Sequence, residues 1–576
     1  MTDVIRVEGL SFQYPGAEQT SLTGVDLAIE RGDFVAVVGS NGSGKTTLCK
    51  SFNGLIPHFW SGEFSGKVTV DGVDTLDASV AALSHRVGYV YQDFGNQLVR
   101  PSVRDDVCFG PLNFGLPDFR ARAEDAMRLL GIDHLAPRYI WELSGGQQHL
   151  TALAGVLAME PAVIVVDEPV AELDPARAEE TYRILARVNA ERGTTIVVIE
   201  HHAEFIARYA RSVVLMADGA VRWHLPVREA LSRTGELAGH GIPAPQIVSA
   251  VARLAPEAEV PLTIEEARDA LVAAGRRPVA GRTTEAAATT EAAAGTSASD
   301  PVVATLTGVG HGYRDVHGAR SAVLDEVSLS LRAGERVAVV GSNGAGKSTL
   351  LRLLTGIIVP RTGTVEVNGV DTRSVRPAEL AEHVCYLYQH PEQMFLKDSV
   401  RQEISMFPAQ RGRPGTAELV DRVLRQLRLT ELAERDGRTL SGGQQRRVTL
   451  GIGLAMSPSL LLLDEPTSSL DVSTRHDVTA MLDTLSEHIR CVMVATHDMQ
   501  LVAEWATRVL VLDGGRVVAD TTPAALFDTP ELTEAVRLIP PQISLLGRSL
   551  GMSPPPLSVD ALVAACSPAD LIGTTT

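Results

Sequence analysis

The sequence predicts an α/β fold that is written twice along a chain of 576 residues. Short apolar runs, such as "FVAVVG" at 34–39 and "AVIVVDE" at 162–168, end in glycine or acidic residues and alternate with helical stretches. This alternation is typical of a sheet that carries its functional residues at the carboxyl ends of its strands. The run "VAVVGSNGSGKTTL" at 35–48 returns as "VAVVGSNGAGKSTL" at 337–350, so each half is expected to adopt the same fold.

The repeat extends beyond this run and sets the expected domain organisation. "LSGGQQ" at Leu143 returns 297 residues later at Leu440, and "IPAPQIVSAVARLAP" at 242–256 is echoed at 539–551. Between the copies lies a segment rich in Ala, Thr, Gly and Ser, whose roughly 25 residues would span about 28 Å on average and let the copies pair within one chain. We expect a first domain at 1–235, its extension at 236–274, a flexible linker at 275–300, a second domain at 301–535 and its extension at 536–576.

Composition excludes several classes of protein. Apolar content of 45% and charged content of 21% are those of a soluble globular protein. The sequence contains no apolar run of about 18 residues, so it predicts no transmembrane helix. The first residues lack the layout of a signal peptide. The net charge of −18 disfavours nucleic acid as a partner. The scattered cysteines argue against a disulfide framework and a zinc site and fit a reducing cytoplasm: Cys49, Cys108, Cys385, Cys491 and Cys566.

Two loops match the phosphate-binding pattern G-x-x-x-x-G-K-[ST], and each follows an apolar strand and opens a helix. Lys45 and Lys347 would reach the β- and γ-phosphates of a nucleotide, while the hydroxyls of Thr46 and Ser348 would ligate Mg²⁺. The alternative is a glycine-rich turn after a buried strand. The expected nucleotide-binding residues are Gly39, Ser40, Asn41, Gly42, Ser43, Gly44, Lys45, Thr46 and Thr47 in the first copy, and Gly341, Ser342, Asn343, Gly344, Ala345, Gly346, Lys347, Ser348 and Thr349 in the second.

An acidic pair closes the next apolar strand of each copy. Asp167 and Asp464 can meet Mg²⁺ opposite the loop hydroxyl, and Glu168 and Glu465 are placed to polarise an attacking water. The alternative is a pair of acidic residues that caps a turn before proline. His201 and His497 end a third strand in each copy, where a histidine can also be an ordinary surface residue.

A second anion-binding pattern follows in "LSGGQQ", where glycines after a serine leave backbone N–H groups at the start of a helix. Two phosphate-binding devices in one domain make sense if each signature closes the nucleotide of the other copy. These signature residues are Ser144, Gly145, Gly146 and Gln147, and Ser441, Gly442, Gly443 and Gln444.

Phosphate loop, "LSGGQ", "DE" and a histidine at the end of a strand, in this order and twice, resemble the ATP-binding cassette family. The resemblance implies two tandem P-loop nucleotide-binding domains, each with a helical subdomain and a small C-terminal helical extension, which pair head to tail and trap two ATP with Mg²⁺. One site would combine Lys45, Gln92, Asp167, Glu168 and His201 with Ser441, Gly443 and Gln444; the other would combine Lys347, Gln389, Asp464, Glu465 and His497 with Ser144, Gly146 and Gln147.

The same resemblance assigns further roles. Gln92 and Gln389 would contact Mg²⁺ and the attacking water. Tyr14 and Tyr313 match the aromatic residue that stacks on adenine in the family, although a tyrosine before a strand can equally be ordinary packing.

The segment "YQDFGNQLVRPSVRDDVCFGPLNFGLP" at 91–117 is similar to one subfamily, the ATPases of energy-coupling-factor importers for vitamins and metal ions. This similarity implies a transmembrane coupling subunit and a substrate-binding membrane subunit at the cytoplasmic face of the membrane, with Gln97 on the surface that meets them. The second copy departs, because "VRQEISMFP" at 400–408 lacks the glycine and the aspartate. Two alternatives stay open: a soluble twin-cassette ATPase that acts on the ribosome or DNA, and a twin-cassette sugar or peptide importer ATPase.

The copies are unequal elsewhere. Arg446 and Arg447 become His149 and Leu150, and "TSSLD" at 467–471 becomes "VAELD" at 170–174. Because both copies keep the core residues, we expect two working sites of unequal rate; the alternative is drift without consequence.

Overall fold

The computed structural model describes residues 3–92, 94–169, 175–278, 300–314, 320–468, 470 and 472–566. Most of the expected linker and the "VAELD" segment lie outside these residues, as do two positions of "TSSLD". The chain divides into two compact units, Met1–Ala252 with Glu257–Ala267, and Arg253–Pro256 with Arg268–Thr576. None of the described helices is both long and apolar enough to cross a membrane.

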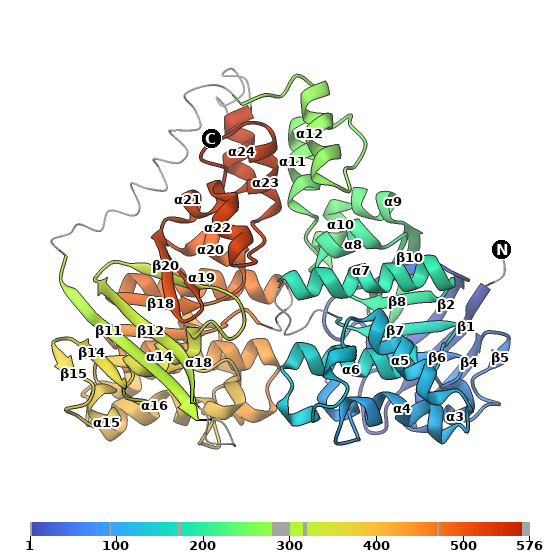
Figure 1. The fold of residues 1–576 in the computed structure, drawn as a ribbon, viewed down its shortest axis with the longest axis horizontal. Coiled ribbons are helices and arrows are strands. Elements are labelled where there is room, and N and C mark those ends of the chain that lie inside the picture. The colour runs from blue at the N-terminus through green and yellow to red at the C-terminus, as the bar shows by residue number, and fades with distance from the viewer. Residues whose placement is uncertain are drawn as a thin grey trace. The chain divides into compact units, whose positions relative to one another are not determined.

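The first unit is built on a six-stranded sheet in the order β10-β9-β3-β8-β7-β6 (Figure 1). All neighbouring strands pair in parallel except β10, which runs antiparallel to β9. Every residue of β3, β6, β7 and β8 is buried, because both faces of the sheet are covered. The strands are β3 (Phe34–Val38), β6 (Val87–Val90), β7 (Val163–Asp167), β8 (Thr195–Ile199), β9 (Ser212–Ala217) and β10 (Ala220–Pro226).

The register of these strands gathers the predicted site at one edge of the sheet. Ile199 of β8 pairs with Val37 of β3 on one side and with Asp167 of β7 on the other. The phosphate loop, the acidic pair and His201 therefore leave the sheet side by side.

An antiparallel sheet, ordered β2-β1-β4-β5, lies over one face of the first unit. Its inner residues share a core with α1 (Lys45–Phe52) and with Val35 and Val37 of β3. The alternate β3 residues Ala36 and Val38 face the helices of the opposite layer, so the strand is buried on both sides. The antiparallel strands are β1 (Asp3–Gln13), β2 (Leu22–Glu30), β4 (Glu63–Val70) and β5 (Val73–Asp74).

The helices of the first unit fall into three groups. One group covers the second face of the six-stranded sheet, one forms a helical subdomain, and one forms a C-terminal extension. The core-covering helices are α7 (Pro175–Arg192), α8 (Ala203–Tyr209) and α9 (Val227–Ser232); the subdomain holds α4 (Val103–Asn113), α5 (Phe119–Leu129) and α6 (Gly145–Leu157); the extension holds α10 (Thr234–Gly239), α11 (Gln246–Leu254) and α12 (Ile264–Ala273). Short helical turns are α2 (Leu55–His58), α3 (Val80–Leu83), η1 (Phe94–Gln97), η2 (Asp133–Leu135) and η3 (Ile140–Glu142).

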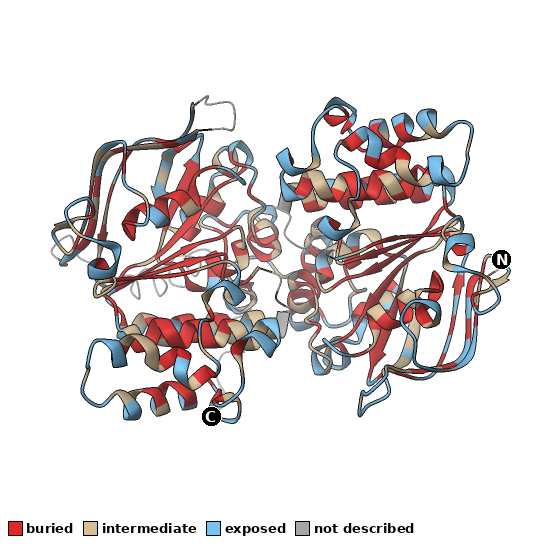
Figure 2. Cartoon of the chain, turned by 90° about the horizontal axis from the view of Figure 1, so that it is seen from below, coloured by how far each residue is buried: buried red, intermediate tan, exposed pale blue. Residues whose placement is uncertain are grey.

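The second unit repeats this plan, with a six-stranded sheet ordered β16-β17-β18-β13-β19-β20 and a four-stranded sheet ordered β12-β11-β14-β15. Its strands are β11 (Val302–Arg314), β12 (Arg320–Arg332), β13 (Arg336–Val340), β14 (Thr362–Val367), β15 (Val370–Asp371), β16 (Val384–Leu387), β17 (Leu460–Asp464), β18 (Cys491–Ala495), β19 (Arg508–Asp513) and β20 (Arg516–Thr521). Within each unit the buried residues follow the core strands and the helix faces turned toward them (Figure 2).

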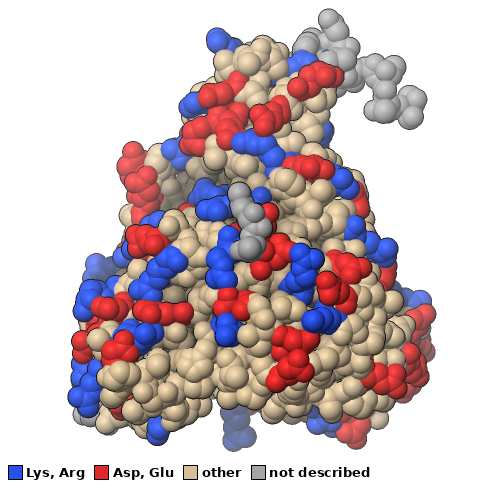
Figure 3. Space-filling model, turned by 90° about the vertical axis from the view of Figure 1, so that its right-hand side faces the viewer, with Lys and Arg blue, Asp and Glu red and all other residues tan. Residues whose placement is uncertain are grey.

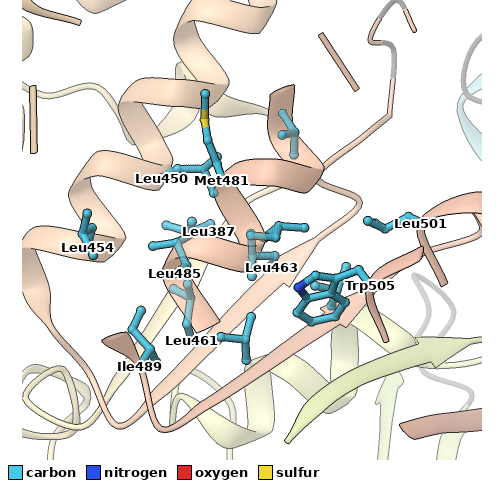
Figure 4. Close-up of a cluster of buried hydrophobic side chains, with 14 of the residues drawn as sticks. Leu387, Leu450, Leu454, Leu461, Leu463, Met481, Leu485, Ile489, Leu501 and Trp505 are labelled. Atoms are coloured by element: carbon cyan, nitrogen blue, oxygen red, sulfur yellow. The ribbon is translucent and has the colours of Figure 1, made fainter. Parts of the chain in front are cut away.

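The helices of the second unit correspond in the same way. They are α14 (Lys347–Leu354), α15 (Pro377–Leu380), η4 (Pro391–Met394), α16 (Val400–Gln410), α17 (Thr416–Gln426), η5 (Thr430–Leu432), η6 (Gly437–Thr439), α18 (Gly442–Met456), α19 (Val472–His488), α20 (Met499–Trp505), α21 (Pro523–Asp528), α22 (Pro530–Ala535), α23 (Gln542–Ser549) and α24 (Val559–Cys566). Leu450 and Leu454 of α18 pack near Leu461 and Leu463 of β17 (Figure 4), so the helix after the second signature lies against the strand that ends in Asp464.

One element differs between the units. The stretch that follows the helix after the phosphate loop and reaches into the next strand is five residues longer in the first unit, at 55–65, than in the second, at 357–362. The extra residues lengthen β4, which begins at Glu63 and pairs with Gln13 of β1.

Candidate functional site

The two phosphate loops depend on glycine for their backbone path. Gly39 (φ 150°) and Gly44 (φ 98°) have positive φ, and a Cβ added to Gly39 would lie 2.2 Å from the carbonyl oxygen of Met216. A Cβ on Gly341 would meet the Leu512 carbonyl oxygen at the same distance. Because only glycine fits, the loop can bring its N–H groups close to a phosphate at the start of the following helix.

Both predicted phosphate-binding lysines are buried and held by the loop itself. Lys45 Nζ donates to the carbonyl oxygens of Gly39 at 2.8 Å and Ser40 at 3.0 Å. Lys347 Nζ donates to Gly341 at 2.7 Å and Ser342 at 3.3 Å. A buried ammonium requires such partners, and they fix the lysine along the inner side of its loop, where the β- and γ-phosphates are expected.

The structure brings the predicted magnesium ligands of the first copy together. The Asp167 carboxylate accepts a hydrogen bond from Tyr89 at 3.2 Å. The Thr46 hydroxyl lies near enough to the same carboxylate to lower its pKa. Burial, followed by the charge of Glu168, raises the pKa of Asp167, while the two hydroxyl contacts act in the opposite direction. A hydroxyl and a carboxylate near one another offer the oxygen ligands that Mg²⁺ prefers, so the residues present fit the ion.

The glutamate that follows each aspartate has an unusual backbone. Glu168 and Glu465 both adopt positive φ, at 51° and 47°. This conformation is unfavourable for residues other than glycine, so the surrounding structure must hold it in place. It turns each carboxylate back from the strand end toward the neighbouring histidine.

The contacts of these glutamates differ between the copies. Gln92 Nε2 donates to Glu168 Oε2 at 2.7 Å, and His201 Nε2 lies 3.5 Å from Glu168 Oε1. In the second copy His497 Nδ1 lies 2.9 Å from Glu465 Oε2. Burial, the largest influence, favours the protonated form of Glu465, but His497 and then Lys347 lower its pKa below the ordinary value. Glu465 is therefore kept ionised, as a base requires.

The signature serines close a capping box. Ser144 Oγ accepts the N–H of Gln147 at 3.4 Å, and the Gln147 side chain accepts the N–H of Ser144 at 3.1 Å. Ser441 and Gln444 repeat both contacts. The box begins α6 and α18, which we call the signature helices, and leaves the intervening glycine N–H groups at the helix start, as the sequence predicts.

The tyrosines predicted to stack on adenine lie beside the helices that follow the phosphate loops. The hydroxyls of Tyr14 and Tyr313 are each 3.4 Å from a threonine hydroxyl of those helices, Thr47 and Thr349. The Tyr14 ring is also perpendicular to that of Trp60, with centroids 6.5 Å apart.

The two predicted glutamines begin corresponding loops, which we call the glutamine loops (91–100 and 388–397). In the first, Asp106 of α4 accepts the N–H groups of Val99 at 2.7 Å and Arg100 at 2.8 Å. In the second, Glu403 of α16 accepts the N–H groups of the corresponding residues. The aspartate that the second sequence lacks is thus replaced by a glutamate with the same contacts.

Sequence reasoning missed several residues at the sites. Tyr89 and its counterpart Tyr386 hold the predicted magnesium-binding aspartates, and the repeated Tyr-x-Tyr-Gln was the available signal. Glu200, which is 1% exposed, accepts the N–H groups of His201 at 2.7 Å and His202 at 2.8 Å. Nothing local in the sequence points to Glu200, because the second copy has Thr496 there.

Comparison with known proteins identifies the family. The model for the ABC transporter family matches residues 22–171 and 324–468. A putative ABC transporter ATP-binding protein of Streptomyces avermitilis is 37% identical over 562 residues, covering 94% of this chain and 98% of that protein. A protein of the same description from Methanosarcina mazei is 32% identical, covering 93% and 92%.

Among solved structures, cbiO1 from Clostridium perfringens, described as part of the ABC transporter complex cbiONQ, is 32% identical and covers 45% of this chain and 97% of its own, with a TM-score of 0.38. The predicted α/β fold of two tandem cassettes is confirmed by the family match to both halves. The chain therefore belongs to the ABC transporter family, with two tandem cassettes that bind ATP with Mg²⁺ and hydrolyse it.

Proposed function

We propose that this chain is the ATPase of an energy-coupling-factor importer. It would drive a separate transmembrane coupling subunit, with a substrate-binding membrane subunit for a vitamin or transition-metal ion, from the cytoplasmic face of the membrane. The observation that carries the proposal is the first glutamine loop and α4, where the run Val103-x-x-Asp106-Val107-x-Phe109-Gly110-Pro111 matches that subfamily. Asp106 supports it, because its two backbone contacts fix the loop expected to face the membrane partner.

In the proposed cycle, each ATP binds between the phosphate loop of one cassette and the signature of the other. Lys45 and Lys347 hold the phosphates, and Asp167 and Asp464 hold Mg²⁺ together with Thr46 and Ser348. Glu168 and Glu465 polarise the attacking water. ATP favours the closed pair and hydrolysis releases it, which moves the membrane partner.

An exposed aromatic pair supports docking to a membrane protein. Tyr139 and Trp141 stack with ring centroids 4.7 Å apart and an interplanar angle of 7°, and Trp141 is 68% exposed. The N–H of Ile140, between them, donates to the Pro101 carbonyl oxygen at 2.9 Å, which fastens the pair to the end of the glutamine loop. Exposed aromatic surface of this kind favours an interaction site.

The corresponding surface of the second cassette is polar. Asp436 and Arg438 occupy the two aromatic positions and form a 2.8 Å ion pair. Docking faces of different character suit an asymmetric coupling subunit. On the face shown in Figure 3, acidic and basic side chains are interspersed, which is less suited to a nucleic acid than a basic stripe would be.

Affinity purification of the tagged chain from detergent-solubilised membranes of its native host tests the proposal. We expect a transmembrane coupling protein and a small substrate-binding membrane protein in stoichiometric amounts. Trp141→Asp is expected to abolish recovery, whereas Phe59→Asp, at an aromatic residue that is 70% exposed, is the matched control. Recovery of ribosomes or DNA without a membrane protein would overturn the proposal. Recovery of a sugar or peptide permease would replace it with the other importer class.

A further inference from the structure

The glutamine loops of the two cassettes are held by different residues. Each position of the second loop follows its counterpart by 297 residues, as Gln389 follows Gln92. By this correspondence Gln97 becomes Met394, and His149 of α6 becomes Arg446 of α18. Gln97 holds the glutamine loop of the first cassette, and Arg446 holds that of the second. Each of the two is therefore replaced in the other cassette.

In the second cassette the guanidinium of Arg446, on the signature helix α18, is hydrogen-bonded to the glutamine loop. Arg446 Nη1 donates to the carbonyl oxygen of Tyr388 at 2.9 Å, and Nη2 donates to that of Gln389 at 2.7 Å. Nη2 also lies 3.4 Å from the carbonyl oxygen of Glu465. Arg446 is 3% exposed, and burial lowers its pKa to about 10, so it keeps its charge at neutral pH. One side chain thus joins α18 to the loop and to the residue proposed to act as base.

In the first cassette the loop is closed upon itself. Gln97 Nε2 donates to the carbonyl oxygen of Tyr89 at 3.0 Å, and its Oε1 accepts the N–H of Tyr91 at 3.2 Å. His149 is buried against Phe94, with ring centroids 5.2 Å apart, and its Nδ1 has no hydrogen-bond partner among the described residues. Burial lowers the pKa of His149 to about 4, so the ring is neutral.

We propose that Arg446 is a positioning residue that transmits movement of the second signature helix to Gln389 and Glu465, a link with no counterpart among the described residues of the first cassette. The proposal rests on the proposed function, in which Ser441 binds the nucleotide of Lys45 while Gln389 and Glu465 serve that of Lys347. Ser441 caps α18 and Arg446 follows five residues later, roughly 7–8 Å along a stiff helix. Occupancy of one ATP site would then bias the catalytic loop of the other in one direction only.

The primary test isolates the second site with Glu168→Gln in the full chain. In this background Arg446→Ala is expected to lower kcat for ATP by about tenfold or more, since small displacements of reacting groups have effects of that size. KM for ATP is expected to change by less than about twofold, because the phosphate loop is untouched. Arg446→Lys, which restores the charge but not the two-pronged contact, is expected to fall in between.

Arg447→Ala is the matched control. It removes the same charge from the same helix, but Arg447 lies 3.5 Å from Asp477 rather than against the loop. An equal loss in Arg447→Ala, or a wild-type kcat in Arg446→Ala, would overturn the proposal. If Arg446→Ala does not fold, Arg446→Lys decides: a lower kcat at unchanged KM supports the link and a wild-type kcat overturns it.

A double-mutant cycle tests transmission itself. Ser441→Ala is expected to alter the second-site kcat less when Arg446→Ala is also present, and strictly additive effects would overturn transmission. The corresponding cycle combines Ser144→Ala with Gln97→Met in Glu465→Gln protein, and their effects on the first-site kcat are expected to be additive. If the two changes were coupled as strongly as those in the second cassette, transmission would not be specific to Arg446. If the residual ATP turnover of the Glu168→Gln chain survived Glu465→Gln, the proposed site roles would be wrong instead.

Discussion

A tyrosine hydroxyl restrains each aspartate that is predicted to meet Mg²⁺. Tyr386 donates to Asp464 Oδ2 at 2.7 Å, and Tyr89 donates to Asp167 Oδ2 at 3.2 Å. Such a contact orients a carboxylate before the metal arrives, so part of the ordering is already complete when Mg²⁺ and ATP bind.

Removal of this hydroxyl is expected to weaken metal binding without disturbing the core. Tyr386→Phe, in Glu168→Gln protein, should raise the Mg²⁺ concentration needed for half-maximal ATP turnover by about tenfold. Titration of turnover with Mg²⁺ measures this effect. Tyr388→Phe, which alters the neighbouring ring, should leave the titration unchanged; an equal shift in both variants would contradict the role of Tyr386.

His149 is expected to make the first cassette acid-sensitive. Burial lowers its pKa from 6.5 to about 4. As the pH falls below about 6.5, His149 is protonated in the unfolded chain before it is protonated in the folded one. The free energy of unfolding therefore falls progressively between about pH 6.5 and about pH 4, by up to about 3 kcal/mol. The free energy of unfolding of wild type and of His149→Gln is measured with urea at pH 7.5 and at pH 5. On going to pH 5, wild type should lose more stability than the variant. A difference independent of pH would contradict this.

At the scale of elements, the longer segment at 55–65 gives the first cassette an aromatic cluster beside its predicted adenine site. The ring of Trp60 is perpendicular to those of Tyr14 and Phe59, and Lys50 Nζ lies 5.2 Å from its centroid. Edge-to-face pairs contribute about 0.5–1.5 kcal/mol beyond burial, enough to bias the orientation of Tyr14.

Trp60→Ala should therefore raise KM for ATP at the first site by about three- to tenfold, while kcat changes little. The measurement uses Glu465→Gln protein, in which only the first site turns over. Phe59→Ala is the control, since Phe59 contacts Trp60 and not Tyr14. An unchanged KM in Trp60→Ala would show that Tyr14 does not depend on this support.

The sequence predicts those elements whose signals are local. The capping box of Ser144 and Gln147 follows from a three-residue spacing, and the phosphate loops follow from glycines that the backbone requires. Contacts between distant segments give no such signal. Glu403 replaces Asp106 with a longer side chain that reaches the same N–H groups, so the sequence suggested a loss where the structure shows a substitution.

At the scale of the whole chain, both cassettes keep every predicted core residue but surround it differently. The Glu465 side chain is 9% exposed and lies 2.9 Å from His497, whereas that of Glu168 is 24% exposed and lies 3.5 Å from His201. A more enclosed base that is held in one orientation by its partner is better positioned for catalysis before the substrate binds. The inequality that the sequence predicts is therefore expected to favour the second site.

Separate Glu168→Gln and Glu465→Gln variants measure this inequality. Each change should reduce turnover at its own site by about a hundredfold, and the loss of total ATP turnover should be larger for Glu465→Gln. Steady-state phosphate release from the full chain provides the measurement. Equal losses, or a larger loss in Glu168→Gln, would contradict the expected order.

Glu168 and Glu465 have a left-handed backbone that costs folding stability, while their side chains are proposed to be needed for ATP hydrolysis. Glycine would relax that backbone by roughly 1 kcal/mol, and at Glu465 it would also remove a buried carboxylate. Glu465→Gly is therefore a substitution that should leave the fold intact or strengthen it while ending turnover at that site. A search for more heat-resistant variants, made without an activity screen, would tend to replace the two residues on which ATP hydrolysis is proposed to depend.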